Sequence, residues 1–297
     1  MNRFMIGQYG AFDENKYIQD FKAGFYGVEA CLMPEDEIDK LLARSQADGF
    51  RIGVHFPLRA GVSKLRDALF LSKDRTVRMQ AYDLVERELA FLAAMRPEYV
   101  LFHYPKPVIL DDRVDWSEWR FADRSEYEFE SSYSLDELNE MSEALFVWLS
   151  SKGDEYHFTP VLEFDALNLY VYEDSFLEQL LEQHNTIRLC LDTARLYLQE
   201  RLDPFFDSKA VIRRYAKFAA TIHLSNMQIN ENNRIIHSRY PVLPTQDPHE
   251  GWAPIEAYLQ IIKQENKSAK IMFEHRSDLV NEDELWQCYQ WVDGLLS

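Results

Sequence analysis

Four short apolar runs in the second half of the chain each end on a side chain that can bind a metal ion. The runs end at Glu163, Asp192, His223 and Glu274, and they are rich in Val, Ile, Leu or Phe, as buried strands are. In a barrel of parallel strands the C-terminal strand ends converge on one mouth, so these side chains would meet there. The pattern predicts a metal site, although a single acid at a strand end is more often a helix cap or an ion-pair partner.

Strands and helices alternate along the whole chain. Strand-like segments cover 4–9, 27–30 and 51–55, and a fourth ends at His103. The connections are too long for hairpins, so the strands are expected to be parallel, and eight of them close into a single (β/α)8 TIM barrel over 1–297. Helices are expected at about 16–23, 34–48, 74–95, 134–150, 172–183, 208–219, 254–264 and 282–296.

One long segment interrupts this alternation after the fourth strand. Residues 105–133 are dense in acidic and aromatic side chains, and the aromatics argue against disorder. The segment is expected to form either a lid or wall of the barrel mouth or a contact between subunits. Ser134 and Glu137 then have the spacing of a capping box, which predicts the start of the next helix.

Composition excludes several classes of function. The net charge is −18, from 50 acidic and 32 basic residues, and such a surface repels nucleic-acid phosphates. The three cysteines form no C-x-x-C pair, which argues against a zinc finger or a disulfide framework. The N-terminus has no apolar signal core and no apolar run approaches membrane-spanning length, so we expect a cytoplasmic protein without nucleic-acid or membrane partners.

Several motifs resemble one known family, the xylose isomerase-like barrels. That group includes sugar isomerases, ketose 3-epimerases, inosose dehydratases, hydroxypyruvate isomerases and endonuclease IV. The resemblance covers essentially the whole chain. The motifs that carry it are L-E at Glu163, L-D-T-A-R at Leu191 to Arg195, I-H-L-S-N at Ile222 to Asn226 and F-E at Glu274.

The resemblance implies a ligand set and a chemistry. Glu163, Asp192, His223 and Glu274 would hold one divalent ion, and hard carboxylates with one imidazole suit Mn, Mg, Co or Zn. An ion chelated by a substrate carbonyl and its neighbouring hydroxyl acidifies the α C–H and stabilises the enediolate. Glu163 and Glu274 would then exchange protons on opposite faces of that carbon.

The expected function is isomerisation or epimerisation of a small sugar, sugar phosphate or related hydroxy acid. A dehydratase acting on a similar polyol-derived substrate uses nearly the same site, and a barrel that binds a ligand without converting it is a further alternative. The substrate is expected to be anionic, and self-association is left open. An endonuclease IV-like phosphodiester hydrolase is the less favoured reading.

Two departures from the family pattern disfavour the nuclease. Arg195 stands where epimerases and the nuclease carry a histidine, and the Asp-x-His pair of the nuclease has only Ile235-Ile236-His237 as its counterpart. A trinuclear site is therefore incomplete, whereas the mononuclear set is intact.

Further polar residues near strand ends are candidates for substrate binding. His55 and His103 end strands, and they would contact substrate or metal, or only pack and hydrogen-bond. His237 is a third candidate. Arg195 would clamp an anionic substrate group or merely balance the acidic ligands, and the same alternatives hold for other cations after strand ends, namely Arg59, Lys106 and Arg276. His275 is expected to point away from the barrel interior if Glu274 points inward.

Overall fold

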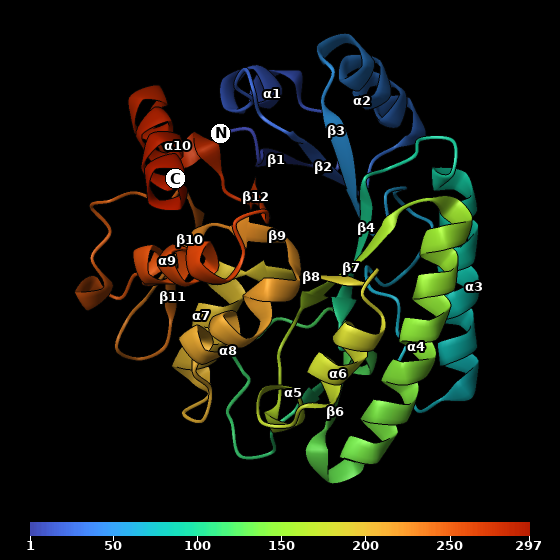
Figure 1. Ribbon diagram of the computed structural model, residues 1–297. Coiled ribbons are helices and arrows are strands. Elements are labelled where there is room, and N and C mark those ends of the chain that lie inside the picture. The colour runs from blue at the N-terminus through green and yellow to red at the C-terminus, as the bar shows by residue number, and fades with distance from the viewer.

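The computed structural model describes residues 1–297 and contains a closed barrel of eight parallel strands. Neighbouring strands follow the order β1, β2, β3, β4, β7, β8, β9 and β12, and β12 pairs with β1 to close the barrel (Figure 1). This confirms the predicted (β/α)8 TIM barrel. The barrel strands are β1 (Phe4–Tyr9), β2 (Gly27–Cys31), β3 (Arg51–His55), β4 (Tyr99–Tyr104), β7 (Thr159–Phe164), β8 (Arg188–Asp192), β9 (Ala219–Leu224) and β12 (Lys270–Phe273).

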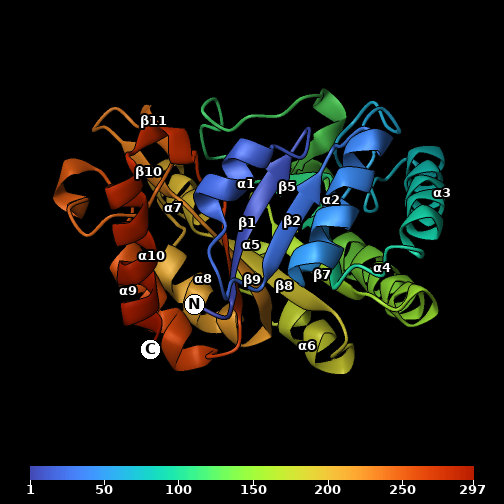
Figure 2. The same cartoon turned by 90° about the horizontal axis from the view of Figure 1, so that it is seen from above.

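Helices surround the barrel, and Figure 2 shows the two chain termini close together at one end of it. None of the helices combines the length and the apolar composition needed to cross a membrane. The α-helices are α1 (Glu14–Asp20), α2 (Glu35–Asp48), α3 (Arg75–Leu92), α4 (Leu135–Tyr156), α5 (Leu169–Tyr172), α6 (Phe176–Gln183), α7 (Thr193–Leu202), α8 (Ser208–Tyr215), α9 (Ile255–Glu265) and α10 (Glu282–Leu296). Short 3-10 helices cover Arg124–Glu126, Glu130–Ser132, Ala216–Phe218, Pro248–Glu250 and Ser277–Leu279.

Most predicted helices are confirmed with shifted ends. The capping box of Ser134 and Glu137 opens α4 as predicted, but α4 continues to Tyr156 rather than ending near 150. The helix predicted at 172–183 is in fact two helices, α5 and α6. The helix α7 was not predicted from the sequence. Six of its ten residues are buried, so it lacks the apolar–polar periodicity that identifies a surface helix.

The strand register brings the polar strand ends together. In β4 and β7, His103 is paired with Glu163, and in β8 and β9, Asp192 is paired with His223. Glu274 follows β12, yet its N–H still donates to a β9 carbonyl at 3.1 Å, that of Leu224. Below these polar side chains the barrel interior is filled by an apolar cluster of Met5, Tyr99, Leu101, Val161, Cys190 and Met272.

Residues 105–133 fold back onto the barrel mouth. Two short strands in this segment, β5 (Val108–Leu110) and β6 (Tyr127–Phe129), pair in parallel. Trp119 is buried, and its indole N–H donates to Asp165 Oδ1 at 3.1 Å, just beyond β7. The segment 105–133 therefore forms part of the wall of the mouth, which is the first of the two alternatives.

Two further strands, β10 (Asn226–Ile229) and β11 (Ile235–Tyr240), pair antiparallel after β9.

Candidate metal centre

The four predicted ligands form one cluster at the barrel mouth. One ligand atom from each of Glu163, Asp192, His223 and Glu274 lies within 4.8 Å of the ligand atoms of the other three. Glu163 and His223 are each 1% exposed, and Asp192 is also buried. The Oδ1 atom of Asp192 accepts the N–H groups of Ala194 and Arg195 and so caps α7. Asp192 is therefore a helix cap as well as a cluster member.

The two ring nitrogens of His223 have different surroundings. Nε2 lies 3.1 Å from Glu29 Oε2, which fixes the ring from inside the barrel. Nδ1 lies 3.2 Å from Glu163 Oε1 and 3.4 Å from Glu274 Oε2, but it is buried and makes no hydrogen bond. An unsatisfied buried nitrogen costs about 1–3 kcal/mol. A lone pair aimed between carboxylates fits a divalent cation, which these hard oxygen donors and one imidazole would bind well.

The pKa values in this cluster reflect its dense charge. Burial, together with the neighbouring Glu274 and Glu163 carboxylates, raises the pKa of Asp192 to about 6. Burial also acts to raise the pKa of Glu274, but the interaction with the neighbouring His223 ring outweighs it and lowers that pKa to about 2. Burial lowers the pKa of His223, yet Cys190, Glu29 and Glu163 hold it well above its usual value. A proton on His223 thus balances the carboxylates, and a divalent cation would displace it.

A triad of His55, His103 and Glu163 shares Glu163 with this cluster. The Nε2 atoms of His55 and His103 lie 3.2 Å and 2.9 Å from Glu163 Oε2. Two guanidinium groups lie against the same ring nitrogens. Arg66 Nη2 is 2.9 Å from His55 Nε2, and Arg195 Nη2 is 3.2 Å from His103 Nε2. Both histidines therefore contact Glu163. A second metal ion would need the lone pairs of the two Nε2 atoms, and these atoms already face the permanent positive charges of Arg66 and Arg195.

A cavity of about 220 Å³ opens beside the cluster. Asp192, Arg195 and Glu274 line one side, and Trp119 and Arg120 of the segment 105–133 line another. A neighbouring cavity of about 370 Å³, next to Tyr9 and α1, meets the first at Glu274 and Arg239. The cluster of candidate ligands is therefore accessible to a small molecule at Asp192 and Glu274.

The sequence and the structure were compared with those of known proteins. No family model and no curated protein matches the sequence. Solved structures do match over nearly the full length. The chain has a xylose isomerase-like TIM-barrel fold. It is similar to the 3-keto-D-glucoside 4-epimerase YcjR from E. coli, with 13% identity, 98% and 99% of the two chains covered and a TM-score of 0.59.

Two other solved structures match the fold over nearly the full length of the chain. A D-tagatose 3-epimerase-like protein shares 12% identity over 98% of this chain and 99% of its own, with a TM-score of 0.63. The protein TTHB071 from Thermus thermophilus, soaked with ZnCl2, shares 17% identity over 99% and 97% of the two chains, with a TM-score of 0.60. At identities this low, the structural matches show only the fold of the chain. The reaction has to be argued from the residues of its own site.

Arg195 contacts acids in this xylose isomerase-like barrel. Its guanidinium lies 3.0 Å from Asp165, 3.4 Å from Asp192 and 3.7 Å from Glu163. These contacts match the charge-balancing alternative for Arg195. The other cations named from the sequence are also paired with acids: Arg59 with Glu88, Lys106 with Asp67 and Asp165, and Arg276 with Asp278.

His237 is not brought into the cluster. It is exposed on β11, where its ring stacks on Trp252 with centroids 5.6 Å apart, and it does not line the cavity beside the ligands. The structure therefore gives no support to substrate binding by His237. His275 does point away from the ligands, as predicted, and packs against Phe273 and Tyr289.

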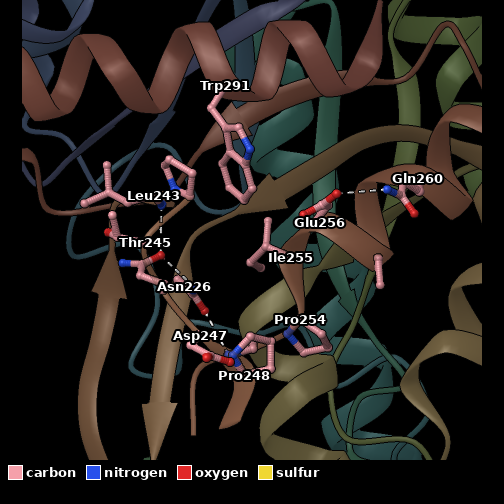
Figure 3. Close-up of a pocket in the computed structure, with 14 residues that line it drawn as sticks. Asn226, Leu243, Thr245, Asp247, Pro248, Pro254, Ile255, Glu256, Gln260 and Trp291 are labelled. Atoms are coloured by element: carbon pink, nitrogen blue, oxygen red, sulfur yellow. Dashed lines mark hydrogen bonds between the residues drawn. The ribbon is translucent and has the colours of Figure 1, made fainter. Parts of the chain in front are cut away.

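Another hollow, of about 520 Å³, lies outside the barrel (Figure 3). It is enclosed by α9, Trp291 of α10 and the loop 243–248. Four of its polar side chains are already paired, since the Asn226 amide donates to Gln246 and the Gln260 amide to Glu256. It brings together no set of ligands or catalytic groups.

Sequence reasoning missed several residues of the site. Glu29 lies in the middle of β2, and its signal was a lone carboxylate between the apolar residues of a predicted strand. Asp165 follows Glu163 by two residues and pairs with Lys106 and Arg195. Arg66 and Asp67 lie in the β3–α3 connection, where the sequence carried no signal for them.

Proposed function

We propose that this protein is a divalent-metal-dependent isomerase or epimerase of a small sugar, sugar phosphate or related hydroxy acid. The observation that carries the proposal is the quartet, three of whose members are buried, in which His223 Nδ1 has no hydrogen bond and faces Glu163 and Glu274. The similar folds include one protein named as a sugar epimerase and one named as epimerase-like, which agrees with this chemistry.

One ion would be held by Glu163, Asp192, His223 and Glu274. When bound there, a divalent ion would polarise a substrate carbonyl and stabilise the negative charge that develops on it. A second ion at His55 and His103 is disfavoured because Arg66 and Arg195 place positive charge at 2.9 Å and 3.2 Å from the two ring nitrogens it would need.

The two glutamates would move the proton. Glu163 is on β7 and Glu274 follows β12, with β8 and β9 between them in the barrel, so the two carboxylates approach the cluster from different sides. A substrate carbon between them would present one face to each carboxylate. One glutamate would then remove the α-proton and the other would return a proton to the opposite face or to the neighbouring carbon. His55 and His103 lie against Glu163 Oε2 and hold that carboxylate in position.

The substrate would be a small sugar or sugar acid. The cavity beside the ligands, at about 220 Å³, is below the usual range of drug-sized sites, which favours a compact molecule. Because Arg195 and Arg239 are already paired with acids, Arg120 is the arginine on the cavity wall left to meet an anionic group.

The test is a substrate screen with metal control. The EDTA-treated protein is loaded with Mn²⁺, Mg²⁺, Co²⁺ or Zn²⁺ and incubated with ketoses, aldoses, their phosphates and sugar acids, and products are followed by proton NMR. We expect a new isomer or epimer that disappears with EDTA and with His223→Ala. Metal binding without any conversion would instead support a binding protein, and loss of water from the substrate would indicate a dehydratase.

A further inference from the structure

Glu29 is a carboxylate at the centre of the barrel that belongs to neither the ligand quartet nor the histidine triad. It is 0% exposed and lies on β2, far in sequence from every candidate ligand. Its Oε2 accepts the Tyr99 hydroxyl at 2.6 Å and lies 3.1 Å from His223 Nε2. Its Oε1 accepts the Tyr9 hydroxyl at 3.3 Å. A carboxylate buried this deeply is costly unless it is paired and hydrogen-bonded, and Glu29 meets both conditions.

The surroundings of Glu29 are shaped for this contact. The Tyr99 ring passes directly over Gly53 of β3, where a Cβ would lie 2.2 Å from the ring Cζ atom. Any larger residue at position 53 would therefore displace the ring whose hydroxyl holds Glu29. Register adds to the arrangement, because Glu29 is paired with Gly53 across β2 and β3.

The contact determines what His223 offers to a cation. In the neutral ring that would bind a metal ion, Nε2 faces the Glu29 carboxylate, so it carries the proton and donates, which leaves the lone pair on Nδ1. Nδ1 is the atom that lies between Glu163 and Glu274 without a hydrogen bond. A carboxylate behind a ligating histidine also makes the imidazole a stronger donor.

We propose that Glu29 is a positioning residue of the metal site, which fixes the proton of His223 on Nε2 and aims Nδ1 at the bound ion. The inference rests on the metal site of the proposed function. Glu29, below the quartet in the barrel, would increase the affinity for the ion beyond what the four ligands alone supply. If the Glu29–His223 contact served only the fold, its loss would change stability and leave ion binding as it was.

The experiment compares metal affinity in matched variants of the full-length protein. Mn²⁺ and Zn²⁺ are titrated into EDTA-treated wild type, Glu29→Gln and Glu88→Gln, using isothermal calorimetry, and each fold is checked by circular dichroism. Glu88 is the control because it is also a buried carboxylate in an ion pair, with Arg59, but lies on α3 outside the barrel mouth. We expect Glu29→Gln to raise the Kd by about 10- to 100-fold. Glu88→Gln should leave it unchanged.

A second readout reports on the ligand geometry itself. The visible absorption of bound Co²⁺ depends on ligand orientation, so Glu29→Gln should alter the spectrum whereas Glu88→Gln should not. If Glu29→Gln does not fold, Tyr99→Phe keeps the carboxylate and removes only the hydroxyl that holds it at 2.6 Å, and should raise the Kd several-fold.

The outcomes separate this inference from the proposed function. A wild-type protein that binds neither ion overturns the proposed metal site, and the role of Glu29 with it. Tight binding by wild type that is equally tight in Glu29→Gln, or in Tyr99→Phe where the first variant does not fold, overturns the role of Glu29 and leaves the metal site standing.

Discussion

His223 Nδ1 lies 3.2 Å from Glu163 Oε1, yet the two atoms make no hydrogen bond. This nitrogen is buried and has no hydrogen-bond partner, although it lies among charged side chains. Its other neighbour is Glu274, whose Oε2 is 3.4 Å away. A cation that binds all three atoms would satisfy the nitrogen and balance the two carboxylates, and the first prediction follows from this arrangement.

The first prediction concerns metal stoichiometry. Purified protein should hold one divalent ion per chain, and His223→Ala or Asp192→Ala should remove it, because each variant deletes one ligand of a single site. Elemental analysis after dialysis gives the ratio. Two or three ions that persist in wild type would point to a multinuclear centre that includes His55 and His103. That result would favour the hypothesis of an endonuclease IV-like hydrolase.

The second prediction concerns nucleic acid. A chain of net charge −18 should neither bind abasic duplex DNA at physiological salt nor cleave it. Gel-shift and nicking assays with added Mn²⁺ or Zn²⁺ test both points. Metal-dependent cleavage that is abolished by Glu163→Gln would contradict the sugar hypothesis.

The third prediction concerns Arg195. Arg195→Met leaves Asp165, Asp192 and Glu163 without their shared cation, so we expect the ion-free protein to lose on the order of 2 kcal/mol of unfolding free energy. Urea unfolding in EDTA measures the loss. Arg276→Met is the matched control, since its pair with Asp278 is exposed and should matter little. Equal stability of the two variants would show that Arg195 does not balance the site.

The fourth prediction tests the acid/base pair. Turnover in D₂O should place deuterium at the converted carbon, because a carboxylate proton exchanges with solvent. Glu163→Gln and Glu274→Gln should each lower kcat by several orders of magnitude, and only the variant lacking the first base should also lose deuterium exchange into unconverted substrate.

Calorimetry must first show that both glutamine variants still bind the ion, because a lost ion would imitate a lost base. Conversion without solvent deuterium would instead indicate a hydride shift, and the two glutamates would then act as ligands alone.

The fifth prediction concerns pH and stability. His275 is buried, neither of its ring nitrogens has a hydrogen bond, and burial, with a smaller effect of the Lys16 ammonium, lowers its pKa to about 3. The unfolded chain takes up this proton near pH 6.5, so the stability that the neutral ring contributes is complete above pH 6.5 and is lost as pH falls toward 3.

His275→Phe removes this pH-dependent loss. At pH 5, in EDTA, wild type should have lost about 2 kcal/mol more unfolding free energy, relative to pH 7, than His275→Phe. His157→Asn serves as the control, because His157 is exposed and its left-handed backbone suits Asn, and this variant should keep the wild-type slope. Parallel curves for all three proteins would rule out His275 as the cause.

The amino-acid sequence alone determined the barrel and the quartet at its mouth. Apolar runs that end on Glu163, Asp192 and His223 are local patterns, and strand periodicity is a local property of the backbone. The start of α4 at Ser134 was readable for the same reason, because a capping box involves residues only three positions apart. By contrast α7 was missed, since a helix buried on several sides carries no periodic signal.

Only the tertiary structure decided which partners these side chains meet. Glu29 and His223 are 194 residues apart and touch because the barrel closes in one register. The same closure pairs Arg195 with three carboxylates, places Arg66 against His55 and leaves His237 exposed on β11. Such contacts depend on distances between strands, and the residue types at those positions allow several pairings. The order of the strands around the barrel selects one of them, because it fixes which side chains share the floor and the mouth.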